Sequence, residues 1–220
     1  PPAVARSGVD ATGDPRDFGH VTTAARELRR YLYLVTSEMP ELLSELPQPQ
    51  TSQLTVVLGV AGDLQSTDVL VTALQDFEPL HDAAGPDDHR LHSSWMTNDS
   101  GDRTLAVGLQ GMSALATKYA VFSLLEEVGV GFRLHGQDAV PRLSVSDITE
   151  RLGALHHKTM TPRAITTRGI QPFHDFSEGP DQWNEDDYRV HFEQLVKLKM
   201  NFIGLHTCKL FNVYPVHNAR

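Results

Sequence analysis

The sequence has one cysteine, Cys208, no long apolar run, and no cluster of lysine and arginine. A single cysteine excludes an internal disulfide bond and any thiolate-rich metal site. No apolar run approaches the roughly 18 residues of a transmembrane helix, so we expect no membrane partner. Nineteen basic residues stand against 28 acidic ones, a net charge of −9, which predicts no nucleic-acid partner.

The amino terminus also lacks a methionine, a basic segment and an apolar leader, so we expect a chain trimmed at its front, of undecided compartment. Eleven histidines raise the question of a metal site, but the spacing of His89 and His92 and the adjacent His156 and His157 match no zinc pattern without cysteines. Gly59 and Gly62 lack the third glycine of a dinucleotide loop. We therefore expect neither a metal nor a cofactor.

Residues 1–140 show an alternation of helix and strand patterns. Apolar residues at helical spacing predict helices over 21–36 and 113–128, the second capped by Ser113 and Gly129, with a weaker helix over 67–77. Apolar and alternating runs predict strands over 54–60, 89–97 and 103–109. The last two strands flank a turn-forming NDSGD segment and are expected to pair antiparallel. The pattern predicts an α+β accessory domain, a mixed sheet with helices on one face.

Residues 141–161 are polar, bounded by prolines and without clear periodicity, which predicts a linker. Residues 162–220 then follow the order strand, helix, strand. Strand 164–173 ends in His174 and Asp175, and strand 202–205 ends in His206. Because a crossover helix joins them, the two strands should be parallel. This is how a (β/α)8 TIM barrel begins, and its reactive rim lies at the carboxyl ends of the strands.

The helix between these strands has strong end signals. Asn184 is the expected N-cap, acidic residues fill the first turn, and Lys197 and Lys199 lie in the last. Its expected buried face comprises Tyr188, Phe192, Leu195 and Val196. A closed barrel takes about 250 residues, so the 220 residues are predicted to hold only the start of one, a truncated barrel.

The segments RGIQPFHDF and NFIGLHT resemble the first two barrel strands of the β-hexosaminidase superfamily of glycoside hydrolases. The order FHDF, GPDQWN, DY, QLVKLKMNFIGLHT is closer still to α-glucuronidase-like members. The segments AARELRRYLYLVTSE, LTVVLGV and GLQGMSALATKYAVFSLLEEVGVGFRLHG are similar to the non-catalytic domain that precedes the barrel in those enzymes. The resemblance implies carbohydrate metabolism, a carbohydrate substrate and a glycosidase as the parent enzyme.

The resemblance also implies site residues. Arg168 matches the arginine that opens the first barrel strand and hydrogen-bonds sugar hydroxyls in hexosaminidases, a task that suits the fixed donors of a guanidinium. His206 matches the second histidine of an Asn-x-x-His-x-His strand, with Gly204 in place of the first. The expected Leu-Asp pair of the first strand is Pro172-Phe173 here. The family's acid and base carboxylates lie on a later strand, beyond residue 220.

The expected substrate-binding residues are therefore Arg168, His174, Asp175 and His206. Each has an alternative structural interpretation: His174, Asp175 and His206 as partners in structural hydrogen bonds, and Arg168 as one half of a structural ion pair. The leading hypothesis is the N-terminal fragment of a glycoside hydrolase, inactive by itself. The alternative is a non-catalytic carbohydrate-binding or interaction module; sugar, linkage and oligomeric state stay open.

Overall fold

The computed structural model describes residues 3–6, 15–43, 54–60, 85–97, 101–160, 165–172 and 179–205. It is a mixed α/β structure with a mixed sheet and, within these residues, four α-helices. The expected helix over 67–77 lies outside the described residues. No helix in the described part of the chain is long and apolar enough to cross a bilayer.

Six strands form the main sheet in the order β2-β1-β3-β5-β4-β6. Five of them run in the same direction, whereas β4 is antiparallel to its two neighbours, β5 and β6. Their bounds are β1 Ala3–Arg6, β2 Glu41–Leu43, β3 Leu54–Val60, β4 His89–Thr97, β5 Arg103–Gly111 and β6 His157–Met160. The predicted strand at 54–60 and the predicted antiparallel hairpin are confirmed, with Thr97 opposite Arg103 at the turn.

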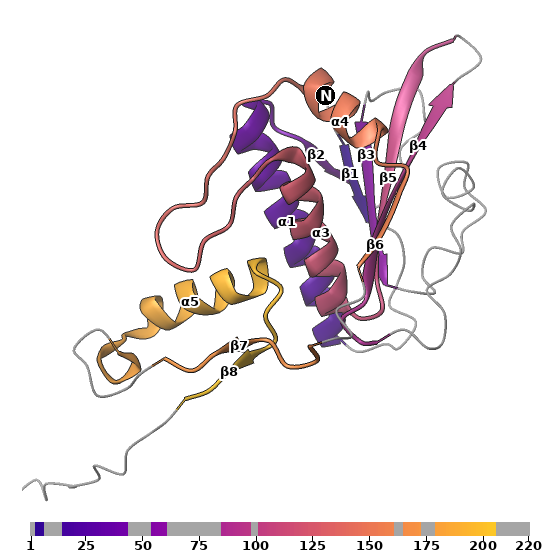
Figure 1. The fold of residues 1–220 in the computed structure, drawn as a ribbon. Helices are drawn as coiled ribbons and strands as arrows, with labels where there is room; N and C mark the ends of the chain where they lie inside the picture. The colour runs from indigo at the N-terminus through magenta and orange to yellow at the C-terminus, as the bar shows by residue number, and fades with distance from the viewer. Residues whose placement is uncertain are drawn as a thin grey trace, which may run out of the picture.

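Two long helices, α1 (Pro15–Thr36) and α3 (Ala114–Val128), lie side by side against one face of this sheet (Figure 1). Both predicted helices are confirmed, although α1 begins six residues before its expected start at Val21. Ser113 caps α3 by accepting the amide of Ala116 at 3.0 Å, and Gly129 ends it with a left-handed φ of 107°. The side chains between helices and sheet form one apolar core, whose large buried members include Tyr31, Phe122, Leu28, Leu32, Leu58, Leu91 and Leu109.

The range 141–161, expected to be a linker, contains a helix and a strand. Helix α4 (Val145–Gly153) has a complete capping box between Ser144 and Asp147 and buries Ile148 and Leu152 in the core. Strand β6 then pairs with β4, so that His89 lies opposite Met160. Residues 145–160 thus belong to the six-stranded structure, because α4 places apolar side chains in its core and the backbone of β6 pairs with β4.

The described residues 165–172 and 179–205 form a parallel β-α-β unit. Its parts are β7 (Gly169–Ile170), a short 3-10 helix (Pro180–Gln182), α5 (Glu185–Lys197) and β8 (Phe202–Ile203). The predicted parallel pairing is confirmed, with Gly169 opposite Phe202 and Ile170 opposite Ile203. Asn184 caps α5 as predicted, accepting the amides of Asp186 and Asp187. Whether further strands close a barrel stays a prediction.

The predicted buried face of α5 is only partly buried. Leu195 is buried, Tyr188 and Val196 are half-buried, and Phe192 is 42% exposed. Within the described residues α5 packs against α3. Figure 1 shows the carboxyl-terminal end of α5 near α3 and its amino-terminal end projecting away from the six-stranded structure. The exposure of Phe192 follows from this placement.

Candidate functional site

Arg168 is the one predicted site residue within the described part of the chain, and it lies immediately before β7. It is therefore level with Asn201, which lies immediately before β8. Both residues stand at the amino-terminal ends of their strands. His174, Asp175 and His206 follow the opposite, carboxyl-terminal ends in the sequence, and all three lie outside the described residues.

The guanidinium of Arg168 has three acceptors, all from the protein. Its Nη2 donates to Oδ2 of Asp87 at 2.8 Å, its Nε to the carbonyl of Lys199 at 2.9 Å, and its Nη1 to the carbonyl of Ile165 at 2.9 Å. The side chains of Arg168 and Asp87 are only 17% and 15% exposed. The geometry is that of a shielded ion pair between two parts of the chain, and a role for Arg168 in sugar binding stays a prediction.

Asp87 receives a second donor on the same oxygen. Nδ2 of Asn201 donates to Oδ2 of Asp87 at 2.7 Å and also to the carbonyl of Thr166 at 2.9 Å. Oδ1 of Asn201 accepts the backbone N–H of Arg168 at 2.9 Å. We call Asp87, Arg168 and Asn201 the Asp87 cluster. One carboxylate of the six-stranded structure thus holds side chains from the starts of both strands of the β-α-β unit.

The residues around the Asp87 cluster are ordered by their own hydrogen bonds. The hydroxyl of Tyr119 on α3 donates to the carbonyl of Met200 at 3.0 Å. Burial and then the nearby charge of Asp87 raise the pKa of Tyr119 to about 12, against the opposing charge of Arg168. The phenol therefore keeps its proton and serves as a donor at neutral pH.

His89, two residues after Asp87, is buried at the start of β4. Its Nδ1 is 2.9 Å from the carbonyl of Asp87, which can only accept, so this nitrogen carries the proton. Its Nε2 then accepts from the hydroxyl of Ser123 at 3.0 Å. Burial lowers the pKa of His89, which favours this neutral form. The serine and the histidine form a hydrogen-bonded pair, but both are closed off from solvent, as a structural pair is.

Two more ion pairs join α5 and its end to the six-stranded structure. Nζ of Lys197 is 3.1 Å from Oδ2 of Asp138, a nearly buried pair whose carboxylate also accepts the hydroxyl of Tyr31 at 2.5 Å. Nζ of Lys199 is 2.6 Å from Oε2 of Glu126 on α3. In all three pairs the acid belongs to the six-stranded structure and the base to the β-α-β unit.

Gly169 lets the two strands of the unit approach. A Cβ atom at this position would overlap the backbone carbonyl of Phe202 on β8. The glycine beside Arg168 is thus required by the close contact of the paired backbones.

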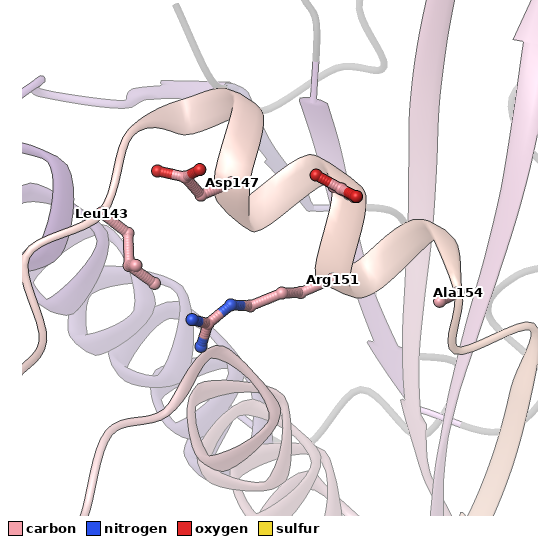
Figure 2. A pocket seen from close by; sticks show the side chains of 5 residues that line it. Leu143, Asp147, Arg151 and Ala154 are labelled. Carbon is pink, nitrogen blue, oxygen red and sulfur yellow. The ribbon is translucent and has the colours of Figure 1, made fainter.

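Elsewhere the structure has a shallow hollow of about 550 Å³ beside α4, lined by Leu143, Asp147, Glu150, Arg151 and Ala154. Figure 2 shows the guanidinium of Arg151 reaching from α4 toward the end of α3, where it donates to the carbonyl of Val128 at 3.0 Å. Ser144 caps α4, and the hydrogen bonds that the carboxylate of Asp147 accepts from Ser144 lower the pKa of Asp147. These charged groups complete helix ends, and we assign them no ligand. The described residues also include no group of three or more potential metal ligands.

The sequence analysis did not identify Asp87, Tyr119 or Asn201 as members of a site. Asn201 was visible as the asparagine of the Asn-x-x-His-x-His pattern, and that was its only signal. Nothing in the sequence around Asp87 distinguishes it from the other acids of its polar segment, since its partners are 81 and 114 positions away. The sequence matches no model of a known protein family, and it matches no curated protein.

Proposed function

We propose that this chain is the N-terminal part of a glycoside hydrolase that acts on O-glycosidic bonds of oligosaccharides or polysaccharides. The observation that carries the proposal is the parallel β7-α5-β8 unit, which follows a mixed α/β structure along the chain. This is the element order that the resemblance to the β-hexosaminidase superfamily implies for an accessory domain and the first two barrel strands. The parallel pair supports the barrel, since parallel strands with crossover helices are its repeating element.

In this proposal the sugar pocket forms at the carboxyl-terminal ends of β7 and β8. His174 and Asp175 follow the first strand and His206 follows the second, so all three side chains would belong to the rim where barrel enzymes bind substrate. An imidazole can donate to or accept from sugar hydroxyls, and a carboxylate accepts from them. Glycoside hydrolysis also needs a general acid and either a second carboxylate or a substrate group in its place. The proposal places these acids on strands outside the 220 residues.

A second candidate is a non-catalytic carbohydrate-binding or interaction module. The observation that favours it is the continuous apolar core of the six-stranded structure, which uses α1, α3, α4 and the central strands. Among the described residues of the β-α-β unit, the half-buried Val196 is the one apolar side chain that packs against this core. Such a core can support an independent module.

A panel of nitrophenyl glycosides distinguishes the two. We expect the 220-residue chain to release no nitrophenol above the buffer rate from any member of the panel. We expect the protein read from the same frame past Arg220 to hydrolyse at least one, and to lose that activity when a carboxylate after the fourth barrel strand is replaced by its amide. Specific hydrolysis by the 220-residue chain would contradict the placement of the acids. A stop codon directly after Arg220 would favour the module.

A further inference from the structure

We infer that Asp87 is a positioning residue, supplied by the accessory structure, that sets the relative position of the first two strands of the proposed barrel. The inference rests on the proposed function for its meaning, because it concerns how the sugar-binding ends of those strands are placed. Its evidence is the geometry of the Asp87 cluster. Oδ2 of Asp87 accepts from Arg168 at 2.8 Å and from Asn201 at 2.7 Å, one residue from the start of each strand.

The cluster fixes the register of β7 against β8. Arg168 and Asn201 are level in the parallel pair, and Oδ1 of Asn201 binds the backbone N–H of Arg168 while its Nδ2 binds the carbonyl of Thr166. A shift of one strand by a single residue would separate the two side chains that share Asp87 and would turn one of them to the opposite face. The carboxylate therefore selects one register among the possible ones.

The residues around the Asp87 cluster strengthen its preference for one register of β7 against β8. The Arg168–Asp87 pair is largely shielded from water, so its attraction is less screened than that of an exposed pair. Tyr119 adds a neutral anchor at Met200, and Glu126 and Asp138 bind Lys199 and Lys197 with the same polarity. Charge complementarity of this kind fixes the orientation in which two surfaces meet.

The arrangement also sets the direction of the strands. Because the Asp87 cluster holds their amino-terminal ends, β7 and β8 run away from the six-stranded structure, as Figure 1 shows. The described residues that follow their carboxyl-terminal ends, 171–172 and 204–205, are then on the side remote from Asp87, and the proposed pocket would form beyond them. Asp87 acts on the pocket only through Arg168 and Asn201, and three donors of Arg168 are engaged in holding the strands.

Amide hydrogen exchange of the whole 220-residue chain tests the inference without a sugar. The reporters are the amides of Asn201, Phe202 and Gly204, which donate to carbonyls of Arg168 and Ile170 across the strand pair. We expect Asp87→Asn and Asp87→Ala to accelerate their exchange by about tenfold, the effect of losing a charge-assisted hydrogen bond. Amides of β3 and β5 should change by less than about twofold.

Matched variants separate positioning from a general loss of charge. Asp181→Asn removes an exposed carboxylate beside α5, and Arg189→Lys changes an exposed arginine on α5, so both should leave the reporters unchanged. Arg168→Lys should behave like Asp87→Asn, and the double variant should be no worse than either single one. Asp87→Glu retains the carboxylate and should recover most of the lost protection.

Unchanged reporter exchange in both Asp87→Asn and Asp87→Ala would overturn the inference. Equal acceleration in β3, β5 and β8 would also overturn it, because Asp87 would then serve the folding of the six-stranded structure. The glycoside assay fails or succeeds independently of these results. Hydrolysis by the longer protein with unchanged exchange in the variants would retain the proposed function and reject the role of Asp87.

Discussion

The six-stranded structure and the β-α-β unit are held together by different forces. In the first, apolar side chains from helices and strands meet in one continuous core. In the second, Val190, Phe202 and Leu205 are 55%, 47% and 47% exposed, and the contacts to the rest of the molecule are largely ion pairs and hydrogen bonds. The comparison shows that the first region can stabilise itself by burial, whereas the second depends on polar contacts with its neighbour.

The largest effect should come from Asp138, which joins the two regions. Asp138→Ala leaves the nearly buried ammonium of Lys197 without its carboxylate and the hydroxyl of Tyr31 without its acceptor. Removal of one partner of a buried pair costs about 3–5 kcal/mol of unfolding free energy, measured here by urea denaturation. The control, Glu127→Ala, breaks the exposed pair with Lys158 and should cost about 1 kcal/mol or less. Equal losses of unfolding free energy in the two variants would show that the Lys197–Asp138 pair contributes no more than an exposed ion pair.

Two leucines compare burial in the two regions directly. Leu109 on β5 is fully buried in the core, and Leu205 after β8 is 47% exposed. Leu109→Ala should lower the unfolding free energy by about 2–5 kcal/mol. Leu205→Ala should lower it by about 0.5 kcal/mol or less. A large loss at Leu205 in the same denaturation measurement would mean that its side chain is covered in solution.

The smallest effect is a dependence on pH, and it involves one histidine from each region. Burial lowers the pKa of His89, and burial followed by the charge of His135 lowers that of His191. The unfolded chain, in which a histidine titrates near about 6.5, then binds protons that the folded chain does not. The unfolding free energy should be constant above that pH and fall as the pH decreases below it.

Denaturation between pH 5 and pH 8 (about the histidine range) measures this slope. His89→Gln and His191→Gln should each reduce it, and the double variant should reduce it further. Leu205→Ala, which removes no ionisable group, provides the baseline. Asp138 does not contribute to this slope. Burial opposes its ionisation, but the hydrogen bonds from Tyr31 and Lys197 outweigh that effect and lower its pKa. A lowered carboxylate pKa changes the unfolding free energy only below the ordinary aspartate pKa of about 3.9. A slope that persists in the double variant would contradict the assignment.

Local signals predicted much of the fold. The cap at Ser113 and the capping box that begins at Asn184 follow from side chains within three residues of the backbone groups they bind. The left-handed end at Gly129 follows from the absence of a side chain there. The capping box of Ser144 and Asp147 was equally visible in the sequence, but a nine-residue helix followed by a four-residue strand left too little periodicity to identify. Strand β2 was not predicted, because it is only three residues long and directly follows Pro40. Proline is disfavoured in central strands, but β2 lies at a sheet edge, where a proline is tolerated.

The candidate site was less accessible from sequence. Arg168 was predicted to open the first barrel strand, and the structure places it just before β7. Its partners are set by the docking of α5 and the strand pair on α3 and on the segment before β4, and no local pattern encodes that docking. The roles of His174, Asp175 and His206 stay predictions, since these residues lie outside the described part of the chain.

The dipeptide Arg168-Gly169 combines two opposite requirements for side-chain size. The arginine needs a long side chain to reach Asp87, and its neighbour can have none, because any Cβ would meet the carbonyl of Phe202. Exchange of the two residues would abolish both contacts at once. A distant relative that shares this architecture should therefore be recognisable by an Arg-Gly step paired with an Asn about one crossover helix later, even where the rest of its sequence has diverged.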